Sequence, residues 1–283
     1  MNLEALKQHR FESKRVGYSW KDTALYNFSV GGGADPMDEK ELGLVYEKKL
    51  SALPTIAAVL AQPGAWIANP KFEVNFLKLL HGEQTLDVHR PIPPEGEIEG
   101  SYAVQAVIDK GEGKGALVVF EKKLTDVASN QPLCTVTTTL FLRADGGCGS
   151  FGTPPAPQPA APTTGFAPLG EVKTGERWAL LYRLNGDLNP IHIDPAAGKK
   201  AGFEKPILHG LCTYGVVGYI LTRAFCDYDP ARLASLNVRF SSPVYPGETI
   251  RVEGMRDGGN VYFQAVVPER NQIVLSNGLA RIR

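Results

Sequence analysis

Three polar residues that could carry out chemistry occur close together in the second half of the chain, in the segment YRLNGDLNPIH from Tyr182 to His192. They are Asp187, Asn189 and His192. The Asn-Gly-Asp and Asn-Pro pairs predict a tight loop, which can direct several side chains toward one point. A carboxylate and an imidazole there could hold one water molecule, because histidine carries protons near neutral pH and a carboxylate can be its partner acid or base. The loop therefore predicts acid–base chemistry.

A plainer interpretation of the same loop is turn formation. Asp and Asn between Gly and Pro commonly cap helices or form Asx-turns, and Asp194-Pro195 is typical of a cap before a short helix over residues 196–201. A reactive site is favoured because His209-Gly210 follows, at the start of a long apolar segment. Free N–H groups at a helix start can stabilise negative charge on a thioester carbonyl oxygen. Together the two features predict one reactive site.

Two similar halves would position these residues. A linker rich in Gly, Pro and Ala over residues 146–168 separates an N-terminal domain, residues 1–145, from a C-terminal domain, residues 169–283. The sequence LHGE at 80–83 precedes PPEGEI in the first half, and LHGL at 208–211 precedes YPGETI in the second. In both halves, runs suited to strands follow and are separated by turn residues. This pattern predicts an antiparallel meander in each half.

The helix that follows the second LHG is predicted over residues 210–226, which are apolar on nearly all sides and therefore buried. Gly215 and Gly218 lower the helix propensity of this segment, which predicts close approach to another backbone. Its first-half counterpart is predicted over Thr55–Ala61, after a helix-starting proline. Leu233–Phe240 alternates apolar and polar residues, as in a half-buried strand. The predicted fold class is α+β, with one buried helix on a curved antiparallel sheet, present twice.

Other candidate residues are weaker. GGGAD at 31–35 lacks both the lysine of a P-loop and the spacing of a dinucleotide-binding loop, so we interpret it as a flexible loop. His81 and His89 have no carboxylate–histidine string beside them, which favours structural roles. The five histidines show no metal-ligand spacing. We therefore expect neither a metal nor any other cofactor.

Composition argues against several classes of partner. Thirty Lys and Arg residues balance thirty Asp and Glu residues, so neither nucleic acid nor a membrane surface is indicated. The N-terminus lacks the apolar run of a signal peptide, and no segment approaches the roughly 18 apolar residues of a membrane span. The four cysteines show no paired spacing, which fits a reducing, cytoplasmic compartment. ARIR at the C-terminus is not a signal of the SKL type, and a peroxisomal location stays open as the alternative.

The segment Tyr182–His192, continued by PILHGL at 206–211, resembles the hydratase 2 motif of the MaoC-like (R)-specific enoyl-CoA hydratases. LLHGEQ at 79–84, HRPIPPEGEI at 89–98 and GGCGSFG at 146–152 resemble the two-domain, eukaryotic-type members of that family. The resemblance implies a double hot-dog fold, in which each repeat has a helix wrapped by an antiparallel sheet. It also implies that only the second repeat keeps the catalytic loop, while the first helps to hold the acyl tail.

The resemblance further implies residue roles. By position, Asp187 and His192 would be the catalytic dyad that holds the water, Asn189 would position substrate and water, and Gly210 would supply an oxyanion-hole N–H. The implied substrate is an acyl-CoA, with no cofactor. A homodimer is an open alternative to a monomer.

Contacts with the CoA moiety are harder to assign. Arg239, on the alternating strand, and His209, beside the helix start, are candidates for CoA binding. An exposed structural arginine is an equal alternative for Arg239.

The expected reaction is reversible hydration of trans-2-enoyl-CoA to (3R)-3-hydroxyacyl-CoA in fatty-acid metabolism, with the R configuration resting on the resemblance. His192 is favoured as the base and Asp187 as the proton donor to C2, although residues alone do not assign a coupled pair. Three alternatives stay open. They are a dehydratase acting on carrier-protein-bound 3-hydroxyacyl groups, a hot-dog thioesterase, which would not need the 187–192 loop, and a non-catalytic acyl-CoA-binding protein.

Overall fold

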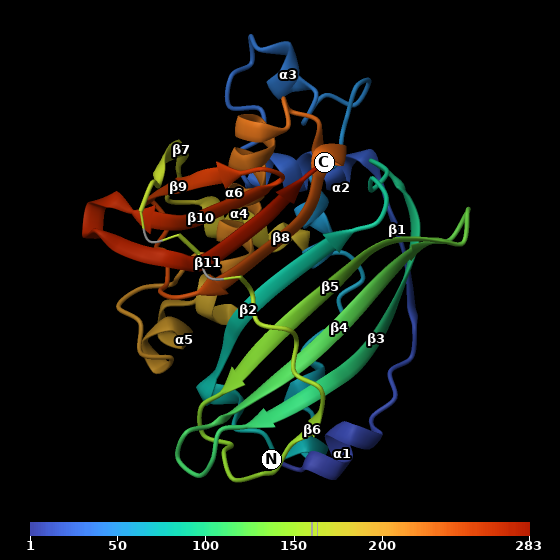
Figure 1. Cartoon of the computed structure of the whole chain (residues 1–283), viewed down its shortest axis with the longest axis vertical. Coiled ribbons are helices and arrows are strands. Elements are labelled where there is room, and N and C mark those ends of the chain that lie inside the picture. The colour runs from blue at the N-terminus through green and yellow to red at the C-terminus, as the bar shows by residue number, and fades with distance from the viewer. Residues whose placement is uncertain (160, 163) are drawn as a thin grey trace.

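A computed structural model describes residues 1–159, 161, 162 and 164–283. Its strands form one curved antiparallel sheet in the order β1-β3-β4-β5-β2-β8-β11-β10-β9-β7, with the short β6 paired to β3 (Figure 1). The strands are β1 (Lys14–Tyr18), β2 (Leu79–Val88), β3 (Gly96–Asp109), β4 (Ala116–Asp126), β5 (Gln131–Leu142), β6 (Phe151–Gly152), β7 (Ala167–Lys173), β8 (Leu233–Phe240), β9 (Thr249–Asp257), β10 (Asn260–Val267) and β11 (Gln272–Ile282).

The pairing of β2 with β8 joins the two halves into this single sheet. The antiparallel ladder runs from Glu83 opposite Arg239 to Asp87 opposite Ser235. The first-half strands lie on one side of it and the second-half strands on the other. In Figure 1 the long strands β3, β4 and β5 run through the lower right of the molecule, and β9, β10 and β11 occupy the upper left. Strands form where the meander pattern predicts them in both halves.

Strand β8 has the predicted bounds, but it is more than half buried. Ser235 and Asn237, on its polar face, are buried, as are Leu236 and Val238 on the other face. At Asn237 the chain between β6 and β7 contributes to this burial, because it crosses the outer face of the sheet (Figure 1) and its residues Pro154 and Gln158 line one hollow with Asn237. The predicted linker thus covers part of the sheet and includes β6 and the first residues of β7. Two positions of it, Ala160 and Thr163, lie outside the described residues.

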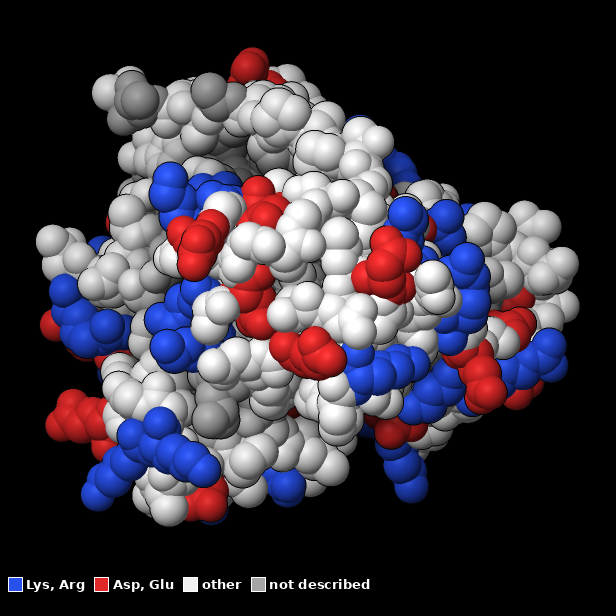
Figure 2. Space-filling model, turned by 90° about the horizontal axis from the view of Figure 1, so that it is seen from below, with Lys and Arg blue, Asp and Glu red and all other residues white. Residues whose placement is uncertain are grey.

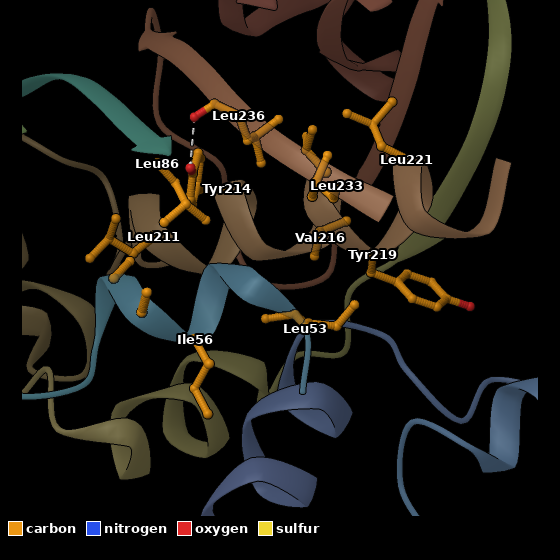
Figure 3. Close-up of a cluster of buried hydrophobic side chains, with 14 of the residues drawn as sticks. Leu53, Ile56, Leu86, Leu211, Tyr214, Val216, Tyr219, Leu221, Leu233 and Leu236 are labelled. Atoms are coloured by element: carbon orange, nitrogen blue, oxygen red, sulfur yellow. Dashed lines mark hydrogen bonds between the residues drawn. The ribbon is translucent and has the colours of Figure 1, made fainter. Parts of the chain in front are cut away.

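Helix α6 (Gly210–Phe225) is the buried helix predicted in the second half. Its residues from Leu211 to Thr222 are all buried, as expected for a segment that is apolar all round. Figure 3 shows α6 between β8 on one side and the first-half segment that carries Leu53 and Ile56 on the other. Tyr214 Oη donates a hydrogen bond of 2.9 Å to the main-chain carbonyl of Leu236 on β8. The helix therefore packs against both halves at once.

Two of the three glycines of α6, Gly215 and Gly218, allow this packing, although not in the way predicted. A Cβ atom at Gly215 would lie 2.5 Å from Cγ1 of Val30, and one at Gly218 would lie 2.6 Å from Cγ2 of Thr55. The close neighbours are thus side chains of the first half, not another backbone. The β-branched side chains of Val30 and Thr55 fill the space that a methyl group at Gly215 or Gly218 would need.

The helix predicted over Thr55–Ala61 is wrong in type and in length. The chain there forms only a 3-10 helix, η1 (Pro54–Ala58), and Ala61 then takes a left-handed conformation with φ of 46°, which is unfavourable for a residue with a Cβ. Lys122 Nζ, buried on β4, donates to two main-chain carbonyls at the end of η1, at 3.3 and 2.7 Å. Burial lowers the pKa of Lys122 to about 7. Among the described residues, the long buried helix therefore occurs once.

The first half instead contains a helix that the sequence pattern did not predict, α2 (Trp20–Ser29). It starts with a capping box in which the Asp22 carboxylate accepts a hydrogen bond of 2.8 Å from Ser19 N–H. Ser-x-x-Asp is a recognised helix-start signal, so this helix could have been predicted. It packs beside α4 (Trp178–Tyr182) and places the ring of Tyr26 against that of Tyr182.

The match between the two LHG sequences is also wrong. LHGE at 80–83 lies inside strand β2, whereas LHGL at 208–211 enters helix α6. The match between PPEGEI and YPGETI holds, because Gly96 begins β3 and Thr249 begins β9.

The remaining helices are α1 (Leu3–Gln8), α3 (Glu39–Leu42), α5 (Pro195–Lys200), η2 (Trp66–Ala68), η3 (Pro70–Phe72), η4 (Phe76–Lys78), η5 (Arg183–Asn185), η6 (Pro190–His192), η7 (Pro230–Arg232) and η8 (Pro268–Arg270). Within the described ranges, no helix has the length and apolar character needed to cross a bilayer.

Charges of both signs alternate over the surface. On the face shown in Figure 2, Lys and Arg side chains are interspersed with Asp and Glu side chains, and neither sign covers the whole face. Charged side chains also pair across strands, as in the 2.7 Å ion pair between Arg239 and Glu83. Exposed pairs of this kind contribute little to stability, about 0–1 kcal/mol each. The burial of α6 contributes more, because each fully buried aliphatic or aromatic side chain is worth about 1.5–3 kcal/mol.

We predict that Gly215→Ala destabilises the protein by about 1 kcal/mol, measured by urea unfolding. Alanine gains about 1 kcal/mol in helix propensity, but its methyl group must displace Val30, and overpacking of a core costs about 1–3 kcal/mol. Gly175→Ala is the control, because a Cβ there meets nothing within 4 Å. Equal stability of Gly215→Ala and the unaltered protein would contradict the tight packing of α6 against the first half.

Candidate active site

The predicted loop follows α4 and contains two short 3-10 helices, η5 and η6. Residues 186–189 separate them, and Gly186 has a left-handed conformation with φ of 105°. Asp187 Oδ1 accepts a hydrogen bond of 3.2 Å from Asn189 N–H, and Asn189 Oδ1 accepts one of 3.2 Å from Ile191 N–H. Both side chains thus make the local turn bonds that the plainer interpretation expects. Asp194 also caps α5 as predicted, accepting from Ala196 N–H at 2.8 Å. These bonds shape the loop around Asp187, which remains half-buried.

His192, the last residue of this loop, is buried, and one of its ring nitrogens is hydrogen-bonded. Its Nδ1 lies 2.9 Å from the main-chain carbonyl of Ile207. A carbonyl can only accept, so Nδ1 carries the hydrogen and Nε2 keeps the lone pair. Burial lowers the pKa of His192, while the Ile207 carbonyl and the Asp187 carboxylate oppose that shift. His192 is therefore a neutral imidazole with a single basic nitrogen.

His209 lies directly against His192. The two rings stack with centroids 3.8 Å apart and an interplanar angle of 25°, and His209 Nε2 donates to the main-chain carbonyl of Asp187 at 3.2 Å. Burial lowers the pKa of His209 to about 4, with a further contribution from His192 and opposition from the Asp187 carboxylate. The His209 side chain has no exposed surface. This burial gives no support to the prediction that His209 binds CoA, because the side chain offers no surface to a ligand.

Gly210 is the first residue of α6, where backbone N–H groups have no acceptor within the helix. A Cβ at this position would lie 3.1 Å from the ring of Phe240 on β8. Glycine thus lets the aromatic ring approach the helix start closely. Phe240 thus lies next to Gly210, and the preceding residue, His209, stacks on His192. The apolar face of the sheet is therefore close to Asp187 and His192.

His81 also reaches this site, although its sequence context predicts a structural role. Its ring lies 4.5 Å from that of Phe240, and its Nε2 is buried without a hydrogen-bond partner among the described residues. Burial lowers its pKa to about 4, and the Asp187 carboxylate opposes this shift. The first half therefore contributes a side chain to the site.

A β-bulge explains the direction of His81. Glu83 and Asp87 line the outer hollow beneath the linker, and simple alternation would turn His81 outward with them. The pairing of β2 with β5 shifts between His81 and Glu83, with Gly82 as the extra residue. One extra residue reverses the side-chain direction, so His81 faces inward. A glycine inside a strand pattern is the sequence signal that could have revealed this.

Arg239 lies on the wrong face for its predicted role. Neighbouring residues of a strand point to opposite faces, and Phe240 faces the helix start while Arg239 lines the outer hollow with Pro155. Its guanidinium pairs with Glu83 across the β2–β8 ladder. The prediction of CoA binding by Arg239 is not supported at this site, since the sheet separates it from the dyad.

Asp187, His192 and His209 could be considered as a metal site, because one donor atom of each lies within 4.8 Å of the others. The stacking argues against this. Two imidazoles coordinate one ion only when their in-plane lone pairs converge on it. In rings stacked at 3.8 Å these lone pairs lie in nearly parallel planes. The arrangement suits a dyad with a neighbouring support better than an ion.

Known proteins resemble both halves of the chain. A family model described as the MFE-2 hydratase 2 N-terminal domain matches residues 17–144, and one described as a MaoC like domain matches residues 149–277. The chain is 34% identical over 291 residues to "Enoyl-CoA hydratase 2, peroxisomal" of Arabidopsis thaliana, which covers 97% of this chain and 94% of that protein. The chain belongs to the hydratase 2 family of MaoC-like enzymes.

Relatives of this family differ in length. The chain is 35% identical over 277 residues to "Peroxisomal multifunctional enzyme type 2" of Mus musculus, a match covering 95% of this chain but 37% of that longer protein. A crystal structure of a MaoC-like dehydratase from Phytophthora capsici has a TM-score of 0.87 at 32% identity, with 100% and 98% of the two chains covered. A Mycobacterium tuberculosis protein described as a double hotdog fold shares the fold alone, with a TM-score of 0.58, 14% identity and coverage of 98% and 97%. The predicted double hot-dog class is confirmed.

In this hydratase 2 family member the first-half loop at 31–35 cannot serve as a second polar site. The buried carboxylate of Glu41 accepts hydrogen bonds from Gly33 N–H at 3.0 Å and Ala34 N–H at 3.3 Å, and its other oxygen accepts from Tyr219 Oη at 2.6 Å. The N–H groups that could cradle a phosphate are therefore already bonded. Because these bonds anchor the loop to α6, its interpretation as a flexible loop is wrong.

We predict that nitrogen NMR of ¹⁵N-labelled histidines finds His192 as the Nδ1–H tautomer and His209 as the Nε2–H tautomer. His209 should titrate at about pH 4 and His192 below its ordinary value of about 6.5. Both histidines have lower pKa values in the folded chain than in the unfolded chain. The unfolded chain therefore binds more protons between about pH 4 and 6.5. Folding stability should therefore fall as pH drops from about 6.5 toward 4. A His209 that is charged at pH 6 would contradict the lowering of its pKa by burial.

Proposed function

We propose that this chain catalyses the reversible hydration of trans-2-enoyl-CoA to (3R)-3-hydroxyacyl-CoA, with Asp187 and His192 holding the reacting water. Members of the family are named as enoyl-CoA hydratases, and the chain spans nearly the whole length of one such relative. The observation that carries the proposal is the dyad itself. His192 keeps one basic nitrogen, and the loop holds the Asp187 carboxylate beside it.

In the hydration direction, His192 Nε2 takes a proton from the water as the water oxygen forms its bond to C3. The electrons of the C2–C3 double bond move toward the thioester carbonyl, which becomes an enolate. His192 then passes the proton that it received to the Asp187 carboxylate, and Asp187 donates a proton to C2. The dyad ends with the protons it began with. Because both steps use one water and one pair of side chains, addition occurs on one face of the double bond.

The enolate charge would be met at the start of α6. Gly210 N–H, the first of α6, has no acceptor within the helix, and it belongs to a rigid, buried element. Donors fixed in advance at the position of developing charge stabilise a transition state without reorganising. The exposed Asn189 is proposed to position substrate and water with the amide nitrogen that its turn bond does not use.

The first half is proposed to hold the acyl tail. The support is the difference between the helices of the two halves: α6 has 16 residues, whereas η1 has 5. A shorter helix leaves more of the inner face of β2–β5 available to an apolar chain. Residues 1–145 would then serve substrate binding and residues 169–283 the chemistry.

The compartment and assembly are also proposals. The four cysteines are unpaired, which suits a reducing compartment, and the names of two relatives place those proteins in the peroxisome. We propose a reducing intracellular location, cytoplasmic or peroxisomal, and a homodimer. Light scattering after gel filtration tests the latter, since a monomer has a mass of 30.7 kDa.

We predict that the purified protein removes the enoyl absorbance of trans-2-decenoyl-CoA and yields the (3R)-hydroxy product on chiral chromatography. Release of free CoA without a hydroxyacyl product would identify a thioesterase instead. Activity on a carrier-protein thioester with none on the CoA thioester would identify the carrier-linked dehydratase. A (3S) product would contradict the R specificity that the family resemblance implies.

We predict that Asp187→Asn and His192→Asn each lower kcat by at least about 10²-fold, the usual contribution of a positioned acid or base. Asp194→Asn is the matched control, because Asp194 caps α5 in the same region through a bond to Ala196 N–H. It should keep both its stability and its kcat, since asparagine caps a helix about as well as aspartate. Near-normal turnover by Asp187→Asn would exclude the mechanism.

A further inference from the structure

We propose that His209 is a positioning residue that holds both members of the dyad in their reactive geometry. This inference rests on the hydration proposed above, because it concerns how the same site is kept in shape. His209 does not touch the substrate, since its side chain is completely buried. It acts through its contacts with Asp187, His192 and the start of α6.

The first contact fixes the loop. His209 Nε2 donates to the main-chain carbonyl of Asp187 at 3.2 Å. The loop has exposed residues on both sides of Asp187, including Leu184 and Leu188, which are 61% and 63% exposed. Packing alone therefore gives this segment little restraint. The hydrogen bond from His209 to the Asp187 carbonyl restrains the backbone from which the Asp187 carboxylate extends.

The second contact fixes the plane of the other ring. The His192 imidazole is held at its edge by the bond from Nδ1 to the Ile207 carbonyl, about which the ring could still tilt. The His209 ring covers one face of it at 3.8 Å. The Tyr182 ring lies against the His209 ring, with the two ring centroids 5.0 Å apart. Together the edge bond and the stack set the direction of Nε2.

The third contact is covalent, because Gly210 follows His209 in the chain. His209 is the N-cap residue of α6, and its carbonyl accepts from Cys212 N–H at 3.0 Å and Thr213 N–H at 3.2 Å. The preceding residue, Leu208, donates to the Val244 carbonyl at 2.7 Å. The residue that holds the dyad is thus part of the rigid frame that presents the proposed oxyanion donor.

Histidine meets this combination of demands better than other residues. The position needs a flat ring on one side and an N–H donor at the ring edge. Phenylalanine supplies only the ring, and asparagine supplies only a donor. The ring must also be neutral, since a second positive charge next to His192 would remove its basic character.

The test compares His209→Phe, which keeps the stack and loses the donor, with His209→Asn, which keeps a donor and loses the stack. Each variant is assayed for hydration of trans-2-decenoyl-CoA, with turnover divided by the folded fraction measured by circular dichroism. We expect kcat to fall about 10–100-fold in each, because displacements of about 1 Å cost up to about 10²-fold. KM should change less than about threefold, since no substrate contact is removed.

The control is His89→Asn, which removes an exposed histidine whose ring bonds Thr135 away from the site. It should keep the kcat of the unaltered protein. A folded His209 variant with unchanged kcat, or one in which only KM rises, would overturn the positioning role. If neither His209 variant folds, Tyr182→Leu tests the same stack from its other side, and unchanged kcat there would overturn it too. Failure of the hydration proposal looks different, because the unaltered protein itself would then form no hydroxyacyl product.

Discussion

The pairing of β2 with β8 is the interaction on which the rest of the structure depends. Two separate half-sheets would each leave a row of unpaired N–H and C=O groups at an edge. The ladder from Glu83 opposite Arg239 to Asp87 opposite Ser235 satisfies both edges and orients one half relative to the other. The same strands carry His81 and Phe240, so this ladder also builds one wall of the candidate site.

The second constraint is that α6 must be buried from both sides. An all-round apolar helix of 16 residues needs a sheet on one side and a cover on the other. The cover comes from the first half, through α2 and η1, and Gly215 and Gly218 let those segments approach. The first half therefore completes the core of the second, which explains why its own helix need not be long.

Periodicity predicted the parts of the fold that are local. Strand β8, helix α6 and the meander strands follow from alternation and apolar runs, and the 187–192 loop follows from its Gly, Asn and Pro residues. The first-half helix failed because tertiary contacts decide it: Lys122 takes carbonyls that a longer helix would use. His81 was missed because its direction depends on a bulge that shows only in the pairing of β2 with β5. The burial of His209 and the sheet face of Arg239 were not predicted, because neither can be deduced from spacing alone.

Burial of the histidines explains why the site divides its work between an exposed loop and a buried helix start. A buried imidazole loses hydration, which favours its neutral form, and a carbonyl partner then determines which nitrogen keeps the lone pair. For His192 this leaves Nε2 as the one basic atom, and for His209 it leaves an N–H aimed at the loop. If His192 were on the exposed surface of the loop, water would compete for both ring nitrogens. Hydration would then favour the charged form of the imidazole. The half-buried Asp187 side chain lies near solvent, while its backbone is held by a group that solvent does not reach. Reactivity and restraint are thus supplied by different residues, and the fold brings them together only where α6 begins.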